Sequence, residues 1–215
     1  MPDWTGIRDR AAERWADGRA RLPEDADQRR RQLTRTGNAA YAAGLAALMA
    51  GDDPSEWLAR AADAYRESFA DAPPDSWGRP IGVVKARLIA GDMDAAADDA
   101  RWALEAGAEG AATPIGRYAA ALALLVLGRD HEARRVADEL RIHDGFPTDV
   151  GDALAYVAAG DLVGYIEAIE SVLDSFERRD EYLEDVPVAD TVLAIQALAR
   201  ARGLEVELKS ELLPP

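Results

Sequence analysis

The chain has 215 residues, of which 48% are hydrophobic and 30% charged, with no cysteine and a formal net charge of −15. This composition is that of a globular protein with a substantial core rather than of a disordered chain. The lack of cysteine excludes disulfides, thiolate zinc sites and a cysteine nucleophile. The negative surface disfavours nucleic-acid partners.

Amphipathic and apolar stretches of helical period follow one another along the whole chain. They predict helices near residues 3–20, 25–50, 54–70, 79–90, 92–106, 114–127, 129–142, 147–159, 161–178 and 187–202. The stretch 118–127 has no charged side chain, which is typical of a helix buried between neighbours. The longest uncharged stretch, Thr36 to Gly51, is too short to span a bilayer, and the first residues lack the pattern of a signal peptide. We therefore expect a cytoplasmic protein without membrane contact.

Glycine and proline mark the ends of these stretches at regular intervals. Glycine followed by aspartate or arginine recurs at spacings of 40, 37 and 32 residues, at positions 51, 91, 128 and 160. Proline recurs at spacings of 34, 33 and 40 residues, at positions 80, 114, 147 and 187. Glycine suits the residue after a helix, whereas aspartate or proline suits the first turn of the next helix. Two such series with similar periods indicate an internal repeat of helical hairpins.

The repeat resembles the tetratricopeptide repeat. The turn glycine and the small second-helix residues of that family are matched by 91–96 with Ala100, Ala103 and Leu104, and again by 128–133 with Ala137 and Leu140. The unit at Gly160 is a weaker copy, because Tyr165 stands where a small residue is expected. The resemblance implies an all-α protein, an α-α superhelix or solenoid of antiparallel helical hairpins with about nine or ten helices.

We expect one domain over residues 1–215. In this interpretation residues 1–35 form N-terminal capping helices, 36–178 the repeat units, and 179–215 a C-terminal capping helix and tail. A second resemblance concerns Leu198 to Pro214, which is similar to the C-terminus of immunity protein family 49. Those proteins are helical antidotes found beside polymorphic toxins, so this resemblance implies a protein that binds and blocks a toxin.

Sites for chemistry are sparse in the sequence. His131 and His143 are twelve residues apart, too far for both to hold one metal ion on a single helix. The acids at 92, 94, 98 and 99 lack the alternation of a calcium loop, and no glycine-rich loop follows a strand. We expect no metal, no cofactor and no catalytic residue.

The polar and aromatic side chains of the otherwise apolar first helices are the candidate partner-binding residues. Arginine and aromatic residues dominate interface energetics, and arginine donates charge-assisted hydrogen bonds to carboxylates. The alternative for Arg79 and Arg117 is internal pairing with acids at repeat junctions. The candidates for the concave face are Asn38, Tyr41, Trp77, Arg79, Lys85, Arg117 and Tyr118.

These features favour a non-catalytic module that binds a protein or peptide partner in its groove, with a toxin-neutralising immunity protein as the most concrete form. One alternative is a small-ligand-binding protein or an enzyme that uses the carboxylates Glu184, Asp185 and Asp190 around Pro187 as general acid and base. Another alternative is a structural subunit of a homo-oligomer. We expect a monomer or a homodimer.

Overall fold

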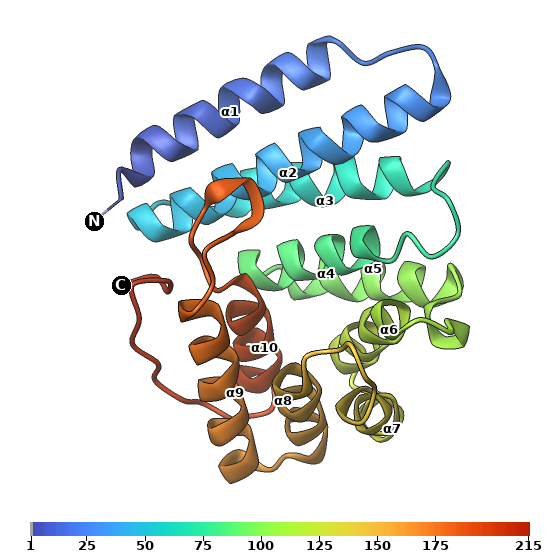
Figure 1. Cartoon of the computed structure of the whole chain (residues 1–215), viewed down its shortest axis with the longest axis vertical. Helices are drawn as coiled ribbons and strands as arrows, with labels where there is room; N and C mark the ends of the chain where they lie inside the picture. The colour runs from blue at the N-terminus through green and yellow to red at the C-terminus, as the bar shows by residue number, and fades with distance from the viewer. Residues whose placement is uncertain (1) are drawn as a thin grey trace.

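A computed structural model describes residues 2–215, and this part of the chain is all-helical, with ten α-helices, two short 3-10 helices and no strand (Figure 1). The α-helices are α1 (Trp4–Ala20), α2 (Ala26–Ala50), α3 (Ser55–Phe69), α4 (Gly78–Ala90), α5 (Met93–Glu105), α6 (Pro114–Val126), α7 (Asp130–Arg141), α8 (Thr148–Ala159), α9 (Leu162–Glu177) and α10 (Asp190–Arg200). The 3-10 helices are η1 (Ala108–Gly110) and η2 (Leu183–Asp185).

The predicted helices are confirmed, each with ends within three residues of those observed. The glycines that follow α2, α4 and α8 adopt left-handed conformations, with φ of 80°, 74° and 67° at Gly51, Gly91 and Gly160. The side chains of Asp92 and Asp161 then accept hydrogen bonds from the first turns of α5 and α9. At Gly91-Asp92 and at Gly160-Asp161 the pair therefore ends one helix and begins the next, as the sequence predicted.

Neighbouring helices pack in sequence order from α1 to α10 (Figure 1). Helices α4 and α6, and α6 and α8, also pack against each other, so these three helices form a series. Helix α6 is buried from Tyr118 to Leu125, in agreement with its apolar sequence.

Glycines in α2 and α4 bring these helices close to a ring of α3. A Cβ atom at Gly37 would lie 2.7 Å from Cδ1 of Tyr65, and a Cβ atom at Gly82 would lie 2.9 Å from its Cε2. Because real Cβ atoms do not approach a ring so closely, both positions need glycine. The Tyr65 ring is thereby fixed between α2 and α4.

The last helix returns across earlier ones. Helix α10 packs against α4, α8 and α9. Arg202, just beyond it, donates to the carbonyl oxygen of Leu125 at 2.6 Å and forms an ion pair with Asp130. The tail also turns back, because the N–H of Ala189 donates to the carbonyl oxygen of Leu212 at 2.9 Å. The C-terminal residues thus cover part of the surface of α4, α6 and α8.

Helix α2 is continuous through Ala26–Ala50, so the expected boundary between residues 35 and 36 falls inside one helix. Among residues 2–215, none of the helices combines the length and the apolar character needed to cross a bilayer.

Candidate functional site

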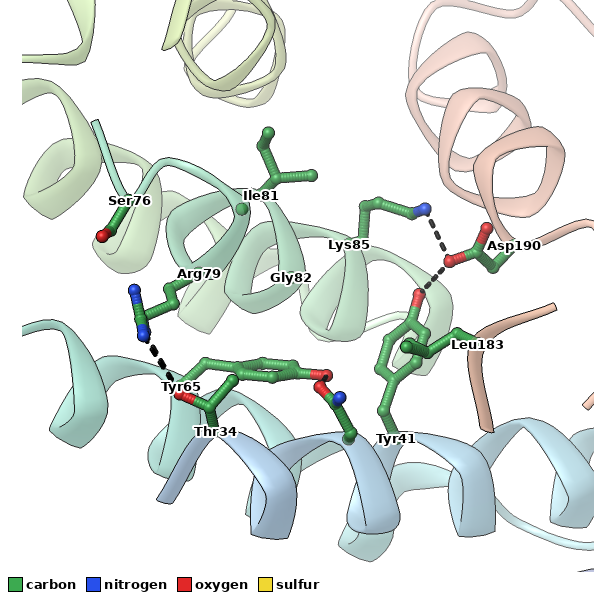
Figure 2. Close-up of a pocket in the computed structure, with 12 residues that line it drawn as sticks. Thr34, Tyr41, Tyr65, Ser76, Arg79, Ile81, Gly82, Lys85, Leu183 and Asp190 are labelled. Carbon is green, nitrogen blue, oxygen red and sulfur yellow. Dashed lines mark hydrogen bonds and ion pairs between the residues drawn. The ribbon is translucent and has the colours of Figure 1, made fainter. Parts of the chain in front are cut away.

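A pocket of about 410 Å³ opens between α2, α3 and α4, beside η2 and the first turn of α10 (Figure 2). We call it the α2–α4 pocket. Its walls combine two tyrosines and two aliphatic side chains with six polar or charged side chains. It is lined by Thr34, Asn38, Tyr41, Tyr65, Ser76, Gly78, Arg79, Ile81, Gly82, Lys85, Leu183 and Asp190.

A buried ion pair occupies one end of the pocket (Figure 2). Lys85 Nζ lies 2.6 Å from Asp190 Oδ2 and 3.0 Å from Thr191 Oγ1. The Tyr41 hydroxyl donates to the same Asp190 oxygen at 2.9 Å. Burial and the charge of Asp190 raise the pKa of Tyr41 well above its usual value, so the phenol stays neutral and donates. The charges of Lys85 and Asp190 offset each other.

Tyr65 and Asn38 form the middle of the pocket. The Tyr65 hydroxyl donates to Asn38 Oδ1 at 2.9 Å. Burial raises the pKa of Tyr65, and the charge of Asp190 adds to this effect. Since Asn38 uses only its oxygen within the described part of the chain, its amide nitrogen is free to donate to a ligand.

Arg79 lies at the other end of the pocket. Its Nε and Nη2 atoms donate to Thr34 Oγ1 at 3.3 and 3.2 Å, and no carboxylate of residues 2–215 lies within 4.0 Å of its guanidinium. Burial lowers the pKa of Arg79, and the nearby charge of Arg30 lowers it further. Arg79 is half-buried, whereas the other arginines of the described chain that lack an ion pair are exposed: Arg10, Arg35, Arg135, Arg179 and Arg200.

The pocket therefore carries one uncompensated positive charge in a protein whose net charge is −15. A half-buried guanidinium without a counter-ion is costly unless hydrogen-bond acceptors approach it. The arrangement suits a singly charged anion, such as a carboxylate, better than a dianion.

The structure brings together four of the seven candidate residues, Asn38, Tyr41, Arg79 and Lys85, and places the other three elsewhere. Trp77 is buried, with its ring centroid 6.1 Å from that of Phe69. Arg117 forms an ion pair with Glu139 of α7. Tyr118 packs against Phe146 at a centroid distance of 5.5 Å, and burial of its hydroxyl, with the charge of Asp190 adding to the effect, raises its pKa.

The three carboxylates of the alternative site are distributed over different surroundings. Asp190 lies in the α2–α4 pocket, paired with Lys85. Glu184 lines a separate pocket of about 370 Å³, where its Oε2 lies 3.2 Å from Arg14 Nη2. Asp185 is exposed and lines neither pocket.

Both histidines are exposed. Over residues 2–215, no group of three or more histidine, aspartate or glutamate side chains is arranged to hold a metal ion.

Sequence reasoning missed several residues of the pocket, above all Tyr65 and the pairing of Lys85 with Asp190. Tyr65 lies in the apolar stripe of its helix, and a tyrosine at such a position is normally interpreted as a core residue. Lys85 did carry a signal, because it is one of only two lysines in the chain and interrupts an apolar helix. A buried lysine requires an acidic partner, yet the sequence does not say which of forty acids supplies it.

No family model matches the chain, and no match was found among curated proteins or among solved structures.

Proposed function

We propose that the protein is a non-catalytic binding module that seats a segment of a protein partner in the α2–α4 pocket. The volume of about 410 Å³ accommodates one or two side chains. Tyr41, Tyr65 and Ile81 offer aromatic and aliphatic surface to such side chains. Tyrosine and arginine are also the residues that contribute most to protein interfaces.

The observation that carries this proposal is the missing counter-ion of Arg79. A carboxylate of the partner, from an acidic side chain or a chain end, would complete the hydrogen bonds of its guanidinium. Such charge-assisted bonds contribute about 1.5–3 kcal/mol each. Asn38 would orient the partner through its amide nitrogen, and the Lys85–Asp190 pair would keep the other end of the pocket neutral.

We further propose that the helical hairpins form an α-α superhelix similar to tetratricopeptide repeats. The serial packing of α4, α6 and α8 and the left-handed glycines after α2, α4 and α8 support this interpretation. In such a superhelix the partner would contact the part of the inner face that α10 leaves open.

Affinity capture from an extract of the source cell tests the proposal. Immobilised wild-type protein should retain a specific partner, and Arg79→Gln should lose it. Arg117→Gln is the matched control, because Arg117 already pairs with Glu139 outside the pocket. Identical retention by Arg79→Gln and the wild type would contradict a role of the pocket in binding.

A toxin-neutralising immunity protein is the most concrete form of this proposal. The support is the resemblance of Leu198 to Pro214 to the end of immunity protein family 49. We expect that a toxin encoded beside this protein arrests growth when expressed alone and that co-expression restores growth. Growth arrest that persists despite stable co-expression would argue against this form and leave other protein partners in place.

A second candidate function is the binding of a small organic acid. It is favoured by the convergence of Lys85, Asp190 and Tyr41 within one pocket. Thermal unfolding of the purified protein with a library of monocarboxylates distinguishes the two functions. A rise in the melting temperature that requires Arg79 would favour the small ligand over the protein segment.

A further inference from the structure

The link between α9 and α10 crosses α2 at the edge of the α2–α4 pocket (Figure 1). We call residues Tyr182–Val186 the strap. Consecutive side chains of the strap serve two pockets: Leu183 lines the α2–α4 pocket, and Glu184 lines the neighbouring one that contains Arg14. Movement of this short segment would therefore change both pockets at once.

The backbone of the strap is strained. Glu184 and Asp185 have φ values of 55° and 59°, in the left-handed region that favours glycine. Two successive non-glycine residues in this region cost free energy, which contacts of the flanking residues must offset, and such strain is often found in segments that move. Asp75 is the only other non-glycine residue of the described chain with a positive φ.

Firm contacts fix both ends of the strap, whereas its centre is held weakly. Val186 is 2% exposed, and the Tyr182 hydroxyl donates to the carbonyl oxygen of Phe176 at 2.8 Å. Leu183, by contrast, is 48% exposed at the pocket, where it lies near Tyr41 (Figure 2). The long-range side-chain contact of the centre is the 3.2 Å ion pair of Glu184 with Arg14, and solvent reaches both partners. Ion pairs of this kind are weak.

We propose that the strap is a gate of the α2–α4 pocket, in which Leu183 narrows the pocket from one side and the Glu184–Arg14 ion pair is the latch. Rupture of the latch releases the strained turn, and Leu183 then leaves the Tyr41 end of the pocket. A partner that offers an anion to Arg14 opens the gate by displacing Glu184. The inference rests on the proposed function, because it takes this pocket as the binding site.

Thiol labelling tests the gate without any partner. The chain has no cysteine, so Asn38→Cys introduces a single reactive group inside the pocket. Its reaction with a bulky fluorescein maleimide is timed in the wild-type background and with Arg14→Gln. The matched control is Arg8→Gln. Arg8 lies on α1, as Arg14 does, and this substitution breaks an ion pair with Asp52, away from the strap.

We expect Arg14→Gln to accelerate labelling about two- to fivefold over Arg8→Gln, as the loss of a weak ion pair allows. Asp185→Gly should slow labelling, because glycine relieves the strain of the closed strap. Equal rates in the two arginine backgrounds, or faster labelling in Asp185→Gly, would overturn the proposal.

If the Asn38→Cys variant does not fold, hydrogen exchange of backbone amides tests the gate instead. The amides of Asp185 and Val186, which donate within the strap at 3.1 Å, should exchange faster in Arg14→Gln than in Arg8→Gln. Unchanged exchange would contradict the gate. Neither measurement involves a partner. If the gate is absent, the capture experiment with Arg79→Gln still tests the proposed function, and if no partner is captured, the labelling and exchange rates still test the gate.

Discussion

Buried tyrosine hydroxyls differ in whether they find a partner, and this difference determines what each contributes to stability. Tyr41 donates to Asp190, whereas the buried hydroxyl of Tyr165 has no hydrogen-bond partner in the described chain. Burial raises the pKa of Tyr165 to about 12. An unsatisfied hydroxyl costs the free energy of its lost hydration.

We predict that Tyr165→Phe leaves the free energy of unfolding unchanged or raises it by up to about 1 kcal/mol, because only an unpaired hydroxyl is removed. Tyr41→Phe should lower it by about 1–3 kcal/mol, because Asp190 loses a donor. Urea denaturation of both variants measures the difference. A larger loss in Tyr165→Phe than in Tyr41→Phe would show that Tyr165 has a partner after all.

At the residue scale, the sequence indicated which types of side chain form the site, but it did not indicate which residues each of them contacts. Arg79 directly precedes a Pro-Ile-Gly segment, and Arg117 directly follows another. The sequence therefore made both arginines candidates for partner binding. They differ because Glu139 of α7 reaches Arg117, while no acid reaches Arg79. Such pairing depends on how helices cross, which local sequence does not specify.

At the scale of elements, one ion pair connects α10 to α4. Lys85 and Asp190 are largely buried, with side chains 10% and 18% exposed. The loss of one partner leaves the other charge buried without compensation.

We predict that Lys85→Met alone lowers the free energy of unfolding by about 3–5 kcal/mol. The triple variant Lys85→Met, Asp190→Leu and Tyr41→Phe should recover most of this loss, because it removes both charges and the phenol hydroxyl that donates to Asp190. Calorimetry of both variants measures the recovery. A triple variant no more stable than the single one would mean that the pair itself stabilises the packing of α10.

Glu67 of α3 joins the first three helices. It pairs with Arg19 of α1 at 2.8 Å and Arg29 of α2 at 2.9 Å. The hydrogen bond from Arg19, followed by that from Arg29, lowers the pKa of Glu67. A pKa that is lower in the folded state adds stability above the unfolded-state value, and this stability is lost as the pH falls through the folded-state pKa.

Unfolding free energies of the wild type and Glu67→Gln between pH 7 and pH 3 test this linkage. The advantage of the wild type over Glu67→Gln should begin to shrink at about pH 4.3, the usual pKa of glutamate, and should vanish once the pH has fallen through the lower folded-state pKa. Parallel curves over the whole range would contradict the linkage.

Helix positions were predictable because local chemistry sets them. Adjacent residues form the helix ends: the left-handed glycines are Gly91 and Gly160, and the caps that follow them are Asp92 and Asp161. The return of α10 onto α4 and α8 was not predictable in this way. It depends on contacts more than a hundred residues apart, such as Lys85 with Asp190.

At the scale of the whole molecule, the net charge of −15 bears on self-association. Like-charged surfaces repel, and salt screens this repulsion. We predict a monomer of 23.2 kDa by light scattering at low ionic strength. A stable dimer under these conditions would favour the alternative of a homo-oligomer subunit.

The central claim, that the α2–α4 pocket receives a protein partner, is tested most directly by photo-crosslinking. A benzophenone amino acid is placed at position 81, in the pocket, or at position 115, an isoleucine that is 46% exposed and outside it. After irradiation in the source cell, we predict a covalent adduct with one partner from position 81 and none from position 115. An adduct from position 115 together with none from position 81 would contradict the account.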